Sequence, residues 1–433
     1  MKKNGFTLVE ITVCVVLLVT IFLIVVPKVN TMINNKKKNA YNSLISTVKD
    51  AAQAYVYLNV NIVDDAIESQ GYYEVSIRTL QENELLENKL ENPLTGKNIP
   101  STSIVKIIKN NEEYIYKFSL DYQYLLEHII DLYSSEETRI SNGLKKDNTE
   151  DKNIRYYGSD PNNYVSFNNE LWRIIGVFGN NVKLVRKDSL GSLSWDSSES
   201  SINGGVGINQ WGESKDADGN EYAGADLQVY LNKMYYGGTS VTCYGGTKNS
   251  TTTCPTNTLD NTAKALIDNH TWNTGAPNHS TLYNSTTQSY DTVEFYKAER
   301  GTVNGKICSS GTYCNDTVTR TTEWTGYIGL PYVTDYAYAS SENDCNTKID
   351  RSSTYKCKNN NWMHRSTSTW YMSPYAFPNN ATSVWYVYGD GSSGLSLAAD
   401  ALSAFPTIYL KSNVLIDSGK GTSSDPYILK AGL

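Results

Sequence analysis

A single carboxylate, Glu10, stands at the head of a long apolar run near the start of this 433-residue chain. The run extends from Ile11 to Val26 without a charged residue, and two lysines, a glycine and a phenylalanine precede the acid. An ionised glutamate costs roughly 2.5–3.5 kcal/mol at the centre of a bilayer, and less near its edge. We therefore expect Glu10 to meet a cationic partner.

The order of the two lysines, Gly5, Phe6 and Glu10 resembles the processing site of type IV pilins and pseudopilins. The resemblance implies that a prepilin peptidase cuts after Gly5 on the cytoplasmic side and N-methylates the new terminus at Phe6. The lysines would hold this leader, residues 1–5, inside by the positive-inside rule. In a filament, Glu10 would then lie near the terminal amine of Phe6 on a neighbouring subunit, so that two buried charges neutralise each other.

Three simpler interpretations compete with this one. A secretory signal peptide would need a small-residue cleavage site after the apolar core, and Val25-Val26-Pro27-Lys28 does not provide one. An ordinary membrane anchor stays open, because Phe6 to Val26 has about the twenty residues that a membrane-spanning helix needs. A buried core helix is the third interpretation, and the run is long for one.

The helix is expected to continue beyond the apolar run as far as Leu58. Pro27 lacks an N–H group and should bend the helix rather than end it, because apolar residues recur afterwards at spacings of three, four and seven. These residues are Val29, Ile33, Ala40, Leu44, Val48, Ala51 or Ala52, Tyr55 and Leu58. A helix from Phe6 to Leu58 would be roughly 80 Å long at 1.5 Å per residue. Residues 6–26 could thus lie in a membrane or filament core while the rest carries a sheet.

A small antiparallel sheet is predicted to follow this helix. The expected strands are Tyr72–Ile77, Ile104–Ile108 and Tyr114–Phe118, the last two flanking Asn110-Asn111 as in a β-hairpin. A short helical or turn segment at Thr79–Leu90 and a turn-rich loop at 92–97 lie between the first two strands. This succession resembles the globular head of minor pilins and pseudopilins, so we interpret residues 6–120 as a pilin-like domain.

Residues 121–153 are interpreted as a helical segment followed by a charged linker. Apolar residues within 121–134 fit a short helix, whereas 135–153 is charged and almost without large apolar side chains. Such a composition is typical of a linker or an exposed arm.

The remaining region, residues 154–433, has a composition of its own, with all eight tryptophans amid abundant Tyr, Asn, Ser, Thr and Gly. Strands are predicted at Tyr164–Phe167, Leu171–Phe178, Val182–Arg186, Trp324–Leu330, Thr382–Tyr388 and Ile408–Leu410, with turns at Asn168-Asn169 and Gly179-Asn180-Asn181. Helices are predicted at Asp226–Tyr235 and Thr262–Asn269. Many short strands with few helices predict an α+β or mostly β domain.

Five motifs in this region are its most characteristic stretches: Asn168–Val177, Trp195-Asp196, Leu231-Asn232, Glu323–Leu330 and Gly421–Tyr427. They resemble a recurrent bacterial extracellular domain near the C-type-lectin-like fold. The motifs consist of strand cores and turns, so they imply a fold and carry no chemistry. The expected fold class is therefore α+β, with a pilin-like helix and sheet followed by a β-rich, loop-rich domain.

Six of the seven cysteines fall late in the chain as neighbours in sequence: Cys243 and Cys254, Cys308 and Cys314, and Cys345 and Cys357. An even number in an exported region predicts disulfides, and nearest-neighbour pairing is the simplest of the fifteen connectivities. Zinc is the alternative, but there is no C-x-x-C motif and the four histidines lack ligand spacing. The seventh cysteine, Cys14, is expected to act as a small hydrophobic residue within the apolar run.

One loop brings together oxygen-bearing side chains that calcium could use. Asp216, Asp218 and Asn220 lie within a stretch of carboxylates and an amide, as in cation-binding loops. Gly219 falls at the fourth position of the loop, whereas the EF-hand pattern needs a glycine at the sixth. A solvated turn is therefore favoured over a metal site.

Three tryptophans are candidates for stacking on sugar rings. Trp211, Trp362 and Trp370 have polar neighbours in the sequence, and a flat aromatic face beside Asn or Asp suits a saccharide. The alternative is that they are core residues, because a region of this size needs a core and has few Leu and Phe.

No catalytic constellation is recognisable in the sequence. The motifs G-x-S-x-G and H-E-x-x-H are absent, as is a phosphate-binding glycine loop. The net charge of −7 and the pI of about 5.3 argue against a nucleic-acid partner. We therefore expect a protein that is not an enzyme and needs no cofactor.

The sequence and its resemblances together predict a minor or tip subunit of a type IV pilus, with residues 154–433 as an exposed module for adhesion to a glycan or a surface protein. A domain this large would crowd its neighbours in a major subunit, whereas a tip has room. The alternative is a pseudopilin of a type II secretion-like or competence (DNA-uptake) machine. The expected partners are other pilin subunits, the prepilin peptidase and the cytoplasmic membrane, which the chain would cross once before reaching the cell surface.

Overall fold

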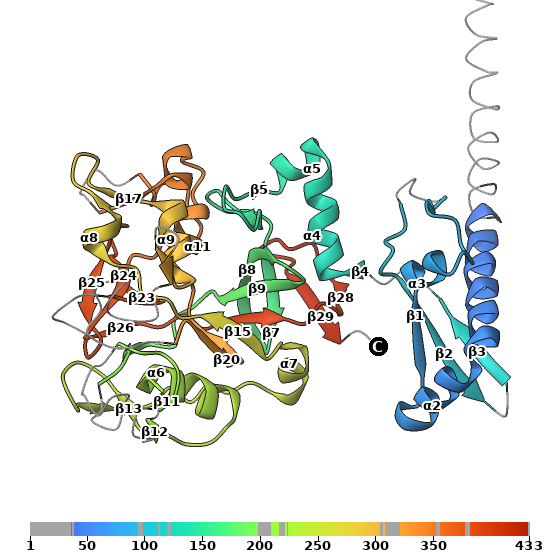
Figure 1. Ribbon diagram of the computed structural model, residues 1–433, viewed down its shortest axis with the longest axis horizontal. Helices are drawn as coiled ribbons and strands as arrows, with labels where there is room; N and C mark the ends of the chain where they lie inside the picture. Colours follow the sequence, from blue (N-terminus) through green and yellow to red (C-terminus); the bar gives the residue numbers. More distant parts are fainter. Residues whose placement is uncertain are drawn as a thin grey trace, which may run out of the picture. The chain divides into compact units, whose positions relative to one another are not determined.

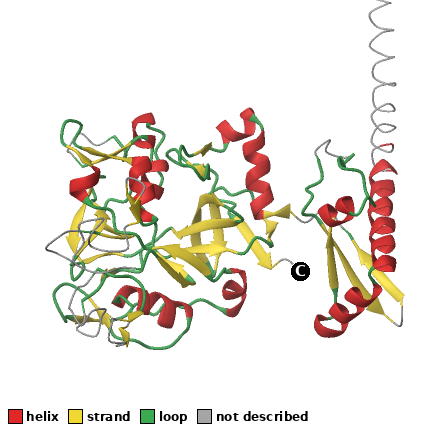
Figure 2. Ribbon diagram, viewed as in Figure 1, coloured by secondary structure: helices red, strands yellow, loops and turns green. Residues whose placement is uncertain are grey.

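The computed structural model describes residue 36 and residues 39–431, apart from 94–97, 111–112, 119–122, 198–208, 216–220, 223, 304–305, 308–320, 352–355 and 377–381. The chain divides into two compact units, the first ending at Gln123 and the second beginning at Tyr124 (Figure 1). Helices and sheets are mixed, and strands predominate in the second unit, as the α+β prediction requires (Figure 2).

The start of the chain falls outside this description. Gly5, Phe6, Glu10 and Pro27, together with the apolar run, are not among the described residues. Within the described ranges, none of the helices has the length and apolar character needed to cross a membrane.

The first unit combines a helix at 39–58 with a three-stranded antiparallel sheet in the order β1-β2-β3. Its remaining elements are α2 (Val60–Gln70), β1 (Tyr73–Ser76), α3 (Ile77–Glu82), β2 (Ile104–Asn110) and β3 (Glu113–Lys117). Strands β2 and β3 pair antiparallel from Lys106 opposite Lys117 to Asn110 opposite Glu113. The predicted hairpin and the strand before it are therefore confirmed.

The helix at 39–58 packs on this sheet through the apolar face that the sequence predicts. Val48, Ala52 and Tyr55 are buried in one core with Val105 and Ile107 of β2. The prediction is wrong at its last position, because Leu58 is 67% exposed. The helix ends there, at Asn59, so the residue no longer follows the buried face.

A 10-stranded sheet forms the centre of the second unit, in the order β21-β27-β9-β8-β7-β29-β28-β4, with β6 paired to β8 and β5 to β6. Its strands are β4 (Gln123–Tyr124), β5 (Leu144–Lys146), β6 (Ile154–Tyr156), β7 (Tyr164–Phe167), β8 (Glu170–Phe178), β9 (Asn181–Arg186), β21 (Ile328–Gly329), β27 (Thr407–Leu410), β28 (Val414–Ser418) and β29 (Tyr427–Ala431). The strands predicted in β7, β8, β9 and β27 are confirmed.

A second sheet of five strands has the order β10-β26-β23-β24-β25. Its strands are β10 (Ser192–Ser194), β23 (Thr369–Pro374), β24 (Ser383–Val387), β25 (Ser393–Leu397) and β26 (Ala401–Ser403). Smaller ribbons are built from β11 (Ser214–Lys215), β12 (Glu221–Tyr222), β13 (Cys243–Tyr244), β14 (Thr251–Thr252), β15 (His270–Asn273), β16 (Tyr283–Asn284), β17 (Ser289–Asp291), β18 (Thr302–Val303), β19 (Lys306–Ile307), β20 (Glu323–Gly326) and β22 (Lys348–Asp350).

Short helices lie between the strands of the second unit. They are α4 (Leu125–Ser134), α5 (Glu136–Ser141), α6 (Asp226–Val229), the π-helical η2 (Tyr230–Tyr236), α7 (Asn261–Leu266), α8 (His279–Leu282), α9 (Thr292–Glu299), α11 (Val333–Tyr338) and the 3₁₀-helical η3 (Asn343–Asn346). The helix predicted at Asp226–Tyr235 is confirmed as α6 with η2, and the one at Thr262–Asn269 as α7. Helix α7 begins earlier than predicted, because the Asp260 side chain accepts a hydrogen bond from the Ala263 amide.

The prediction that residues 135–153 form a linker or an exposed arm is wrong. The helix predicted before it is α4, but α5 and β5 then continue the second unit, and Asp147 is only 3% exposed. Lys145 Nζ donates hydrogen bonds to the carbonyl of Ser340 and to Asn346 Oδ1, at 2.9 and 2.7 Å. Composition misled the prediction because these polar side chains find their partners inside the protein rather than in water.

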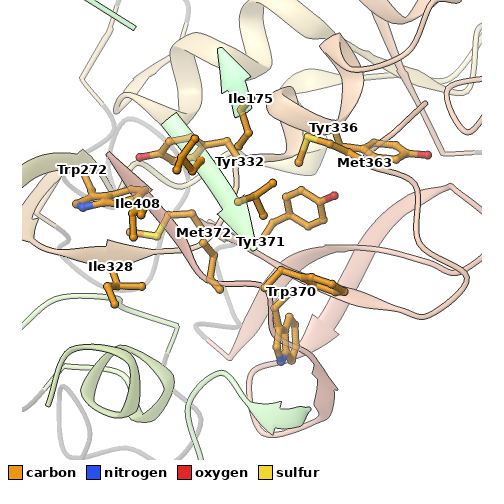
Figure 3. Close-up of a cluster of buried hydrophobic side chains, with 14 of the residues drawn as sticks. Ile175, Trp272, Ile328, Tyr332, Tyr336, Met363, Trp370, Tyr371, Met372 and Ile408 are labelled. Carbon is orange, nitrogen blue, oxygen red and sulfur yellow. The ribbon is translucent and has the colours of Figure 1, made fainter. Parts of the chain in front are cut away.

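The core of the second unit is dominated by aromatic side chains (Figure 3). Trp272, Tyr332 and Tyr371 lie among Ile175, Ile328, Met372 and Ile408, and six of the largest fully buried side chains are tryptophans. Aromatic residues thus supply the apolar volume that the low Leu and Phe content leaves unfilled.

Candidate functional site

A polar hollow of about 580 Å³ opens beside the β16–β17 hairpin of the second unit. Its lining residues come from the end of α8, the hairpin, the start of α9 and β22: Leu282, Tyr283, Asn284, Ser285, Thr287, Ser289, Asp291, Glu294, Thr347 and Lys348. Figure 1 shows α8, β17 and α9 on the same side of the second unit. A volume of this size lies within the roughly 300–1,000 Å³ of small-molecule sites.

The aromatic ring of Tyr283 is held in place by a layer of side chains behind it. The ring stacks on His279 with centroids 4.6 Å apart, and Arg351 Nη1 lies 2.7 Å from His279 Nε2. His279 Nδ1 lies 3.1 Å from the same arginine nitrogen and 2.9 Å from the Tyr290 hydroxyl, so polar neighbours hold the imidazole at both of its nitrogens. Burial first, and the nearby Arg351 charge second, lower the pKa of His279, so the imidazole is neutral at neutral pH.

The hairpin loop presents its polar groups in a fixed arrangement. Asn284 Oδ1 accepts hydrogen bonds from the amides of Thr286 and Thr287, at 3.0 and 3.2 Å, which closes the loop at its first residue. The Thr287 and Ser289 hydroxyls are 2.9 Å apart and hydrogen-bonded to each other. The loop geometry is therefore set by its own side chains.

Charged side chains of both signs lie around the hollow. Asp291 of β17 stands opposite Lys348 of β22 in the antiparallel register, and Glu294 forms a 2.8 Å ion pair with Lys297. One oxygen of Asp291 also accepts the Glu294 amide and so caps α9. Of the charged side chains that line the hollow, two are acidic, Asp291 and Glu294, and one is basic, Lys348.

A second cluster of charged side chains lies inside the second unit. Arg155 of β6 is 1% exposed and joins Asp147 and Asp335, both at 2.7 Å. Lys183 of β9 lies 2.6 Å from the other oxygen of Asp335, with its ammonium group 4.2 Å from the centre of the Tyr332 ring. The Lys183 and Arg155 cations hold the pKa of Asp335 below its usual value despite burial.

Glu299, the last residue of α9, is fully buried and accepts a hydrogen bond from the Thr334 amide at 3.3 Å. Burial raises its pKa to about 7. These charged atoms are enclosed by protein, so the cluster can join β6, β9, α9 and α11 together but does not present a reacting group to solvent. We therefore assign it a structural role.

The prediction that three tryptophans lie at the surface and bind a ligand is wrong. Trp211, Trp362 and Trp370 are 0%, 3% and 0% exposed. The indole nitrogens of Trp362 and Trp370 donate to the carbonyls of Tyr156 and Leu193, at 2.9 and 2.8 Å. These two indoles therefore hydrogen-bond to buried backbone carbonyls, whereas the polar residues beside them in the sequence suggested contact with solvent.

Two of the predicted disulfides are present, Cys243–Cys254 and Cys345–Cys357. Cys308 and Cys314 lie outside the described residues, as do the calcium candidates Asp216, Asp218 and Asn220. Among the described residues, Cys345, Asp350 and Cys357 come close enough to share a metal ion. Since the two sulfurs are joined in a disulfide, they are not available as thiolate ligands.

The hollow leaves no recognisable signal in the sequence. The stretch from Tyr283 to Asp291 shows no alternation of apolar and polar residues and contains no known motif. It therefore predicts neither a strand nor a binding site. Its one usable sign is a tyrosine set among Ser, Thr and Asn, and that pattern recurs throughout the region.

Comparisons with protein-family models, with curated proteins and with solved structures find no match for this chain.

Proposed function

We propose that this chain is a minor or tip subunit of a type IV pilus, carrying its second unit as an exposed module for adhesion to a glycan or a surface protein. The observation that carries the proposal is the order Gly5, Phe6 and Glu10 before an apolar run. The first unit supports it, because a helix packed on a small antiparallel sheet is what a pilin head requires.

The second unit acts, in this proposal, by binding rather than by catalysis. Its open hollow is lined by hydroxyl, amide and charged groups of both signs, whereas Glu299, whose pKa is raised toward neutrality, is buried. The many short strands and the two disulfides accord with the C-type-lectin-like architecture that the sequence motifs imply. Disulfides also suit a location outside the cytoplasm.

The first experiment is a mass measurement on the native chain. Cleavage and methylation predict a mature protein that begins at Phe6 and carries one additional methyl group. Glu10→Ala should abolish incorporation into filaments, because the terminal amine of Phe6 then lacks its counter-charge. Glu136→Ala, at an exposed position on α5, is the matched control and should assemble as wild type. Retention of Met1, or normal assembly of Glu10→Ala, would refute the proposal.

The same N-terminal motif also serves pseudopilins, so a secretion or competence machine is the alternative. Immunogold labelling separates the two. Gold at filament ends favours the tip subunit, and gold confined to the cell envelope without filaments favours the pseudopilin.

A further inference from the structure

We propose that the hollow beside the β16–β17 hairpin binds a neutral saccharide, with Tyr283 as the aromatic platform. This inference rests on the proposed role of the second unit as a binding module. It names the chemical class of the ligand and the place where it binds.

Tyr283 provides an aromatic ring in a fixed orientation. A sugar ring has one face of C–H groups that packs on an aromatic side chain. Tyr283 lies in the hollow wall and is backed by the His279 and Arg351 layer, so its orientation is set before a ligand arrives. Less side-chain freedom is then lost on binding.

Polar groups that can still form hydrogen bonds lie beside that ring. The side-chain oxygen of Asn284 accepts hydrogen bonds from the loop amides, so its side-chain nitrogen remains able to donate to a ligand. In the described part of the chain, neither this nitrogen nor the hydroxyls of Tyr283 and Ser285 form a hydrogen bond. Amide and hydroxyl groups are the partners that sugar hydroxyls require.

The charged side chains of the lining are of both signs. Glu294 is neutralised by its ion pair with Lys297, and Asp291 stands opposite Lys348 in the strand register, so the lining presents no patch of a single sign to an ionic ligand. Within the described ranges, neither acid belongs to a group of side chains close enough to hold a metal ion. The hollow therefore favours an uncharged polar ligand over an anionic sugar, a cationic peptide or a divalent cation.

The hollow is also built on a firm base. Strand β17 pairs with β16 on one side and with β22 on the other. The disulfide Cys345–Cys357 joins the segments on the two sides of β22. The wall that carries Thr347 and Lys348 is thus held from both ends.

The test uses the full chain, purified in a detergent without a sugar headgroup so that the detergent does not compete. A panel of neutral, sialylated and sulfated saccharides is screened first, and calorimetry then gives the affinity for the neutral saccharide that binds best. Tyr283→Ala should weaken binding about 10-fold or more, because it removes the stacking surface. Tyr283→Phe keeps that surface and should stay within about threefold of wild type.

Two further variants complete the test. Ser285→Ile, at an exposed loop position, adds bulk without polar atoms and should block binding while leaving the ring of Tyr283 in place. Tyr327→Ala disrupts another stacked tyrosine pair, with Tyr236, that does not line the hollow, and it should bind as wild type. Thermal unfolding of each variant reports whether it is folded.

The inference is overturned if no neutral saccharide binds, if only acidic saccharides bind, or if Tyr283→Ala and Ser285→Ile both bind as tightly as wild type. Its failure can be told apart from failure of the pilus proposal. Correct cleavage and filament labelling without saccharide binding would refute the hollow alone, and saccharide binding by a chain that never enters filaments would refute the pilus role alone.

Discussion

At the scale of single residues, the sequence predicts the position of a side chain along a strand but not the residues that it contacts. A strand over Val182–Arg186 was predicted, yet Lys183 gave no sign of its ion pair because Asp335 lies 152 positions further along the chain. The prediction of surface tryptophans failed for a related reason. The polar neighbours that suggested exposure, Asn209, Asn361 and Thr369, are themselves buried and hydrogen-bonded to backbone carbonyls, so they do not report whether an indole is buried.

Glu299 gives the prediction that belongs to this scale. Its pKa is raised to about 7 by burial, from an ordinary 4.5, so the folded state keeps a proton that the unfolded state releases. The stabilisation from Glu299 is therefore complete below pH 4.5 and is lost as the pH rises through about 7. Over this interval the wild type should lose up to about 3 kcal/mol relative to Glu299→Gln, at about 1.4 kcal/mol per pKa unit.

Urea unfolding of the oxidised protein between pH 4.5 and 8 measures this difference. Glu294→Gln, at a partly exposed position on the same helix, is the control and should follow the wild type. If the free energies of unfolding of wild type and Glu299→Gln change in parallel over the whole pH interval, Glu299 does not hold a proton in the folded state.

At the scale of elements, local signals succeeded where the information is local. The Asn168-Asn169 pair predicts a two-residue hairpin turn, and both residues have φ of 55° between Phe167 and Glu170, which face each other across β7 and β8. The β16–β17 hairpin escaped prediction because a ribbon of two and three residues is too short to show an alternating pattern. Long strands in a large sheet have a recognisable sequence pattern, whereas short surface ribbons do not.

Asn169 tests this account of the turn. Its side chain is exposed and its φ is left-handed, a conformation in which a β-branched residue is strained. Asn169→Val should lower the free energy of unfolding by about 1–2 kcal/mol. Asn169→Gly, which tolerates the same φ, should leave it unchanged or higher. Denaturant unfolding of the two variants measures the difference, and equal stabilities would show that the turn is not left-handed at this residue.

At the scale of the whole molecule, the pilin-like domain was predicted to end at residue 120, close to Gln123 where the first unit ends. The next predicted boundary, at 153, does not exist, because α4, α5 and β5 belong to the second unit. Composition locates a boundary when apolar patterning stops, but it cannot distinguish a solvated arm from a polar segment folded onto its own protein. The buried Asp147 shows the second case.

The two separate cores predict two separate unfolding transitions. Val105 and Ile107 lie in the core of the first unit, whereas Ile174 and Ile408 lie in that of the second. Since each unit buries its own apolar side chains, each should unfold cooperatively by itself. Ile107→Ala should cost about 2–5 kcal/mol in one calorimetric transition and leave the other in place, and Ile408→Ala should do the reverse. A single transition that both substitutions shift together would show that the chain unfolds as one body, against the division at Gln123.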